Sequence, residues 1–140
     1  MLRVVVPANK EPVSLEMAKK HLRVDTSADD SLIELLITAG REVVEQQTGY
    51  ALVEATYEWS PTGPSCERPP IEPSTITSGE GVFPIRFVTT PGETPAALRA
   101  AILLLVGDTY AIREAGITGT IHVENPAVDR LTFPYRRFLP

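Results

Sequence analysis

The proline-rich middle of this 140-residue chain restricts its fold more than any other feature, because eight prolines fall between Pro61 and Pro95. A proline has no backbone N–H to donate, so within sheets it is confined to edges and bulges. We therefore expect loops and short edge strands here, with residues 82–88 as the one clear strand and Pro84 at an edge or a bulge. Before this stretch, residues 52–59 predict another strand. Residues 2–6 form a short apolar strand or an extended arm.

Two helices are predicted before the proline-rich stretch. Ser14 is the expected N-cap of a short first helix that ends near Arg23. A longer second helix is expected over residues 29–48, and Gly49 supplies its C′ residue. Ser27 and Asp30 have the spacing of a capping box at the start of this second helix, with Asp in place of the usual Glu.

The second helix carries the clearest apolar periodicity in the chain, which predicts the face that it turns to the core. The stripe repeats at steps of four, three and four residues and is widened by three more apolar positions: Leu32, Leu36, Ala39 and Val43, then Ile33, Ile37 and Val44. Arg41, Glu42 and Glu45 lie largely off this stripe. The two glutamates are expected to be a solvated pair on an exposed helix face.

Two more helices are predicted after the proline-rich stretch. Thr94 followed by Pro95 is an N-cap with proline at N1, which starts a helix over residues 95–114. Residues 100–106 of this helix are apolar on every side, so protein should surround it. In so small a domain, another subunit could supply part of that burial. Residues 117–123 predict a β-hairpin arm, and residues 126–133 a short last helix.

These elements predict a mainly α fold: a small helical-bundle domain of about four helices with a short β-rich, proline-rich insertion and a C-terminal docking tail. The length suits one domain over residues 1–140. Residues 1–52 hold the N-terminal helices and residues 53–94 the β and loop insertion. Residues 95–140 hold the buried helix, the hairpin arm and the C-terminal segment.

No group of residues in the sequence points to an active site. His21 and His122 each fit a structural or surface position, and Cys66 lies in a loop without a nearby histidine or a second cysteine. Asp25, Asp29 and Asp30 lack the glycine and the distal glutamate of a calcium loop. Phosphate-binding, dinucleotide-binding and nucleophile-elbow motifs are absent from the sequence. We therefore predict no enzyme, no cofactor and no metal site.

Charge and hydropathy also argue against a DNA-binding, a membrane-spanning and an exported protein. The formal net charge of −5, with few adjacent basic residues, argues against tight DNA binding by one copy. The longest uncharged apolar run, residues 100–106, is far shorter than a membrane span. The N-terminal residues lack the features of a signal peptide, so we expect a chain that stays in a reducing compartment with a free Cys66 thiol.

Three stretches of sequence, in order, carry a resemblance to a known family. The first is Pro-Val-Ser-Leu-Glu-Met-Ala-Lys-Lys-His-Leu-Arg-Val-Asp at residues 12–25. The second joins Asp-Asp-Ser-Leu-Ile at 29–33 to Glu-Gln-Gln-Thr-Gly-Tyr-Ala-Leu at 45–52. The third is Pro-Ala-Ala-Leu-Arg-Ala-Ala-Ile-Leu-Leu-Leu-Val at 95–106, followed by Tyr110, Arg113 and Glu114. Their order and spacing resemble the phage head–tail connector (adaptor) family, whose members are often described as possible DNA-packaging proteins.

The resemblance implies a structural adaptor subunit. It implies a ring of about twelve copies beneath the portal protein, closed by a heterologous contact repeated by rotation. That ring would continue the DNA channel and dock a stopper or tail-terminator component on the tail side. DNA would pass through without specific binding, which suits the negative charge. The expected location is the neck of a phage or of a gene transfer agent, assembled in the bacterial host cytoplasm without a membrane.

Two segments are candidates for contacts within such an assembly. Aromatic residues and arginines anchor many interfaces, so the C-terminal segment is the candidate for docking the portal or a neighbour: Tyr135, Arg136, Arg137, Phe138 and Leu139. The alternative is a tail that folds back on its own domain, and the sequence favours neither. The predicted hairpin offers candidate inter-subunit residues: Ile117, Ile121 and Val123.

Two other functions compete with the adaptor reading. Short helices joined by turns could form the helix-turn-helix of a DNA-packaging or DNA-binding accessory protein, although no basic recognition helix is evident. A small enzyme is the other alternative, and a pocket with convergent ionisable groups would support it.

Overall fold

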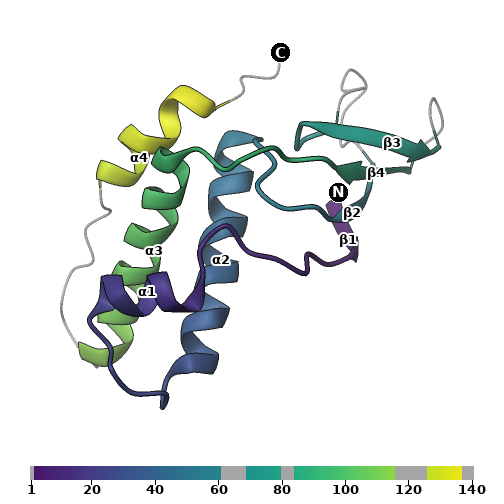
Figure 1. Cartoon of the computed structure of the whole chain (residues 1–140). Helices are drawn as coiled ribbons and strands as arrows, with labels where there is room; N and C mark the ends of the chain where they lie inside the picture. The colour runs from purple at the N-terminus through teal and green to yellow at the C-terminus, as the bar shows by residue number, and fades with distance from the viewer. Residues whose placement is uncertain (1, 61–68, 80–83, 116–125, 137–140) are drawn as a thin grey trace.

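The computed structural model describes residues 2–60, 69–79, 84–115 and 126–136, which form a helical bundle with an antiparallel sheet projecting from one end (Figure 1). The α-helices are α1 (Leu15–Leu22), α2 (Asp30–Thr48), α3 (Ala96–Ala115) and α4 (Pro126–Thr132), and a 3₁₀ helix, η1, follows at Phe133–Tyr135. The strands are β1 (Leu2–Val6), β2 (Thr56–Trp59), β3 (Ser74–Ser78) and β4 (Ile85–Thr89). The mainly α prediction is thus confirmed only in part, because a four-stranded sheet accompanies the helices.

The helix boundaries follow the predicted capping residues closely. The Ser14 side-chain oxygen accepts a hydrogen bond from the Met17 backbone N–H at 3.1 Å, which caps α1. Gly49, at φ 69°, ends α2 and donates its N–H to the Glu45 carbonyl at 2.8 Å. The third helix starts at Ala96, one residue later than predicted, so Pro95 immediately precedes the helix instead of occupying N1, and its carbonyl accepts the Arg99 N–H at 3.1 Å.

The predicted capping box at the start of α2 is wrong. Asp29, not Ser27, occupies the N-cap position, and its side chain makes no capping hydrogen bond. Its Oδ2 instead accepts a hydrogen bond from the Tyr110 hydroxyl of α3 at 2.6 Å. Asp30 pairs with Lys19 of α1 at 2.8 Å. Both aspartates therefore fasten α2 to neighbouring helices, which is a tertiary role that local spacing does not encode.

The core-facing side of α2 is rotated from the predicted stripe. Ile33, Ile37 and Val44 are buried as expected, but Ala39 and Val43 face outward. A close approach of α3 accounts for this orientation. A Cβ added at Gly40 would meet the Ile102 side chain at 3.4 Å, so the absence of a side chain at this one position lets the two helices approach closely.

Helix α3 lies at the centre of the bundle and packs against the three other helices. It buries one continuous face: Leu98, Ala101, Ile102, Val106 and Tyr110. The flanking residues Leu103, Leu104 and Leu105 are half-buried against the same core. Residues of the same chain thus supply most of the burial that was predicted for the apolar run at residues 100–106.

The sheet has the strand order β1-β2-β4-β3, with antiparallel neighbours throughout. Only the second half of the predicted strand at 52–59 is β2. Pro84 was expected to mark an edge or a bulge, yet β4 lies inside the sheet with a partner on each side. The ladder accommodates this because pairing begins one residue later, where Ile85 faces Trp59. The expected short edge strand is β3.

One face of the sheet builds a second core beside that of the bundle. Tyr57 and Phe87 stack with ring centroids 5.4 Å apart, and Trp59, Ile85 and Ile71 complete the cluster. This core depends on cross-strand pairs between segments that are distant in the sequence. Its buried residues all come from residues 51–87, and β1 adds a fourth strand to the sheet from the start of the chain.

Candidate interaction surfaces

The described residues were compared with what a metal site or a membrane span requires. Among residues 2–60, 69–79, 84–115 and 126–136, no three His, Cys, Asp or Glu side chains gather in a way that could hold a metal ion. Within the same residues, no helix combines the length and apolarity needed to cross a membrane. His21 is exposed on α1, and its Nε2 lies 3.2 Å from the position that a Cβ on Gly107 would take. Cys66 and His122 lie outside the described residues.

An ion-pair network joins the bundle to the sheet. Arg41 of α2 donates from Nε to Glu11 at 3.0 Å and from Nη1 to Glu45 at 2.7 Å. The other oxygen of Glu45 accepts the Leu52 backbone N–H at 3.3 Å. One guanidinium therefore ties together the linker before α1, the helix α2 and the linker that leads into β2.

The environment of this network corrects the sequence-based expectation for Glu45. Glu42 is exposed as predicted, but Glu45 is only 2% exposed and is not part of a solvated pair. Burial raises the pKa of Glu45, and the hydrogen bond from Arg41 opposes that rise. For Arg41, burial would lower the pKa, but the hydrogen bonds to Glu11 and Glu45 outweigh it and the pKa is raised. Burial also raises the pKa of Tyr57, to about 12, with the charge of Glu45 as the next cause.

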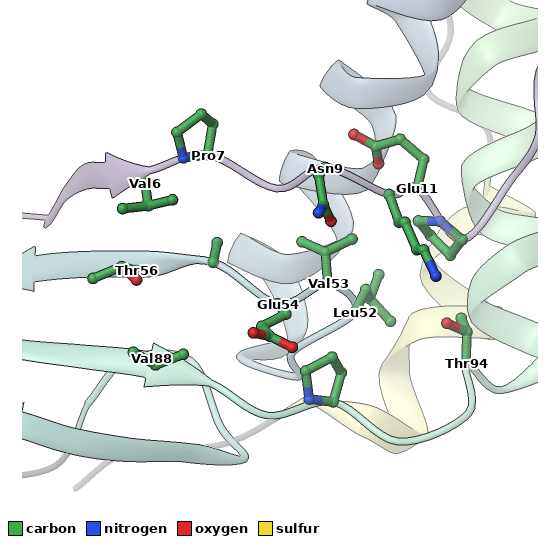
Figure 2. A pocket seen from close by; sticks show the side chains of 14 residues that line it. Val6, Pro7, Asn9, Glu11, Leu52, Val53, Glu54, Thr56, Val88 and Thr94 are labelled. Atoms are coloured by element: carbon green, nitrogen blue, oxygen red, sulfur yellow. The ribbon is translucent and has the colours of Figure 1, made fainter.

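A groove of about 640 Å³ lies where the linkers that join the bundle to the sheet run side by side (Figure 2). Its walls combine polar side chains with aliphatic ones, which include Val6, Leu52, Val53 and Val88. Glu54 is the exposed acid of this groove. Glu11 and Lys10 also line this groove, and the Glu11 carboxylate is already paired with Arg41.

A second groove, of about 280 Å³, lies between β1 and α2. Leu2 and Val4 contribute exposed apolar side chains from β1, an edge strand. Thr38, Glu42 and Gln46 form the wall on α2. Exposed apolar side chains on a sheet edge invite a further contact, because proteins that remain monomeric usually cover or charge such edges.

The predicted docking tail begins within the described residues. Tyr135 packs edge-to-face on Tyr50, with ring centroids 5.7 Å apart. Arg136 pairs with Asp129 of α4 at 2.9 Å. Its remaining residues, Arg137, Phe138 and Leu139, lie outside the described residues, as do the predicted inter-subunit residues Ile117, Ile121 and Val123. Docking through either segment stays a prediction, and the first two tail residues rest on their own domain.

The contact between the two tyrosines should be measurable by a double-mutant cycle. We expect Tyr50→Ala and Tyr135→Ala to be coupled by about 0.5–1.5 kcal/mol, the energy typical of an edge-to-face aromatic pair. Urea unfolding of the two single variants and the double variant measures this coupling. Strictly additive effects would show that η1 does not rest on the end of α2.

The described residues define a small domain in which a helical bundle and a projecting sheet present grooves and exposed apolar edges. The sequence model for phage gp6-like head–tail connector proteins matches residues 12–130, so the chain belongs to this family. The resemblance found in the sequence is thereby confirmed. No curated protein matches the chain.

Three solved structures share the fold. The crystal structure of bacteriophage HK97 gp6 is 21% identical, with 89% of this chain and 93% of that chain covered and a TM-score of 0.55. A chain in the virion of a native gene transfer agent particle is 18% identical, with 99% and 97% covered and a TM-score of 0.69. A chain in the neck of an empty gene transfer agent particle, computed with C6 symmetry, is 19% identical, with the same coverage and a TM-score of 0.70.

Proposed function

We propose that this protein is a structural adaptor subunit in the neck of a tailed phage or a phage-like particle. Copies form a ring of about twelve beneath the portal protein, extend its DNA channel and receive the stopper or tail terminator. The observation that carries the proposal is the family match over residues 12–130. The likeness in fold to a chain from the neck of a gene transfer agent particle supports it.

The chemistry of the described surface agrees with a role that makes and breaks no covalent bonds. Its ionised cluster, Glu11, Arg41 and Glu45, is saturated by internal hydrogen bonds, so its groups are committed to holding the fold. The two grooves combine aliphatic and charged side chains, and two of the carboxylates, Glu11 and Glu45, are paired with Arg41. Such surfaces suit protein contacts, and the net charge of −5 suits a channel that does not retain DNA.

Electron microscopy of the purified protein, with and without its portal protein, tests the ring. We expect closed rings, either alone or once the portal is supplied. Monomers that persist at high concentration and never join the portal would overturn the proposal. Sequence-selective binding of DNA by the isolated protein at low salt would instead favour a DNA-packaging accessory role.

The proposed docking tail can be tested by truncation. Removal of residues 137–140, which include Arg137, Phe138 and Leu139, should leave the unfolding midpoint unchanged because the contacts of Tyr135 and Arg136 are retained. We expect loss of binding to the portal or to the tail-side component, measured by co-sedimentation. Full binding by the truncated chain would assign docking to another surface, with candidate residues Ile117, Ile121 and Val123.

A further inference from the structure

Helix α2 is apolar on two sides, and only one of them is covered. The side turned away from the core carries Leu35, Ala39 and Val43, each one turn apart; we call this row the outer face of α2. Leu35 is 63% exposed and Val43 is 39% exposed. A surface helix normally shows solvent a polar side opposite its core stripe. A second apolar row therefore indicates a second packing partner.

The shape of the outer face suits a protruding side chain. Ala39 is small and stands between the larger Leu35 and Val43, so it leaves a hole of the kind that receives a knob in helix packing. Glu42 lies beside this hole and also lines the groove between α2 and β1. The outer face is thus continuous with the exposed apolar edge of the sheet.

The outer face carries negative charge that its own helix does not neutralise. Arg41 is the only basic residue of α2, and it is buried in its pairs with Glu11 and Glu45. Glu42 is exposed and makes no ion pair with another described residue. A partner for this face should therefore bring an apolar knob with a positive charge close beside it.

The same chain presents that combination on the other side of the bundle. Phe133 is 60% exposed, and Arg130 is exposed three residues earlier, on the same side of α4 and η1. Arg130 also makes no ion pair within the described residues. Figure 1 shows α4 across α3 from α2 and the sheet. Aromatic side chains and arginines are the residue types that dominate binding energies at interfaces.

We infer that the outer face of α2 is one half of the contact between copies, and that Arg130 and Phe133 of the next copy are the other half. Phe133 fills the hole at Ala39, and Arg130 faces Glu42. The two patches differ and lie on different sides of one molecule, which makes the contact heterologous and allows it to close a ring by rotation. This inference rests on the proposed function, and it names the surfaces that build the ring.

The test uses substitutions at exposed positions of the full chain, with assembly followed by mass photometry and electron microscopy, alone and with portal. Ala39→Leu fills the hole with a good helix former, so the variant should fold normally and assemble at least about tenfold more weakly. Glu42→Arg and Arg130→Glu should each weaken assembly by a similar factor, and together they should restore it. Glu93→Arg, an exposed reversal in the linker before α3, is the matched control and should assemble normally.

The outcomes separate this contact from the proposed function. If the wild type forms rings and Ala39→Leu forms them equally well, the assigned surfaces are wrong and the ring itself stands. The assignment also fails if Phe133→Ala keeps its rings and loses only portal binding, because Phe133 then belongs to the portal contact. If the wild type forms no ring under either condition, both proposals fail. If the double variant with Glu42→Arg and Arg130→Glu assembles again, that result supports the contact directly.

Discussion

Replacement of Arg41 by methionine should destabilise the fold by about 3–5 kcal/mol, because it leaves the buried carboxylate of Glu45 without its partner. The loss would be a large part of the total stability of a small domain. Urea unfolding at neutral pH, followed by circular dichroism, measures it. Arg3→Met is the matched control, since Arg3 pairs with Glu58 at 2.9 Å on the exposed face of the sheet. We expect the control to change stability by less than about 1 kcal/mol.

The pH dependence of the Arg41→Met variant gives a second readout. Burial already raises the pKa of Glu45, and loss of Arg41 removes the main influence that lowers it. A carboxyl whose folded pKa is raised favours folding less as pH rises from its unfolded pKa to its folded pKa. The deficit of the variant should therefore shrink as the pH is lowered toward the ordinary pKa of glutamate. A deficit that is the same across this range would mean that Glu45 is hydrated in the variant.

Phe87→Ala should cost about 3–5 kcal/mol, the range for removing a large aromatic side chain from a core. Phe87 is fully buried in the sheet, stacks on Tyr57 and pairs with Ile76 of β3. Its loss removes contacts on two neighbouring strands and leaves a cavity that the short strands cannot close. The shift of the urea midpoint, at an unchanged denaturant slope, measures the effect.

The adjacent residue provides the comparison for Phe87. Val88 lies on the same strand with its side chain on the opposite face of the sheet, where it is half-buried at the large groove. Val88→Ala should cost about 1 kcal/mol or less. Equal losses at the two positions would contradict the one-sided core described for the sheet.

Local chemistry made several helix ends predictable, although the capping box predicted at the start of α2 was wrong. Ser14, Gly49 and Pro95 act through bonds or backbone angles within a few residues of themselves, so their sequence neighbours suffice to place them. The pairing of the strands was harder to predict, because β1 pairs with β2 through partners such as Leu2 and Trp59 that lie far apart in the chain. No pattern within residues 2–6 names that partner.

The face that α2 turns inward could not be read from periodicity, because the helix has two apolar rows. The more regular row, through Ala39 and Val43, was assigned to the core, whereas the structure buries the row that passes through Gly40. One signal was available in the sequence. Arg41 and Glu45 are spaced one turn apart, as an ion pair requires, on the same side as Ile37 and Val44. A charged pair that shares the side of a core stripe points to a buried network.

The position of the Arg41 guanidinium bears on geometry as well as on energy. From α2 it holds Glu11 in the linker before α1 directly and, through Glu45, the Leu52 backbone in the linker to β2, so it braces the place where the sheet departs from the bundle. In a closed ring of identical subunits, a small change of angle within each subunit adds up over all the subunits of the ring. In the proposed ring, a stiff joint at Arg41 would therefore help to set the diameter at which the ring closes.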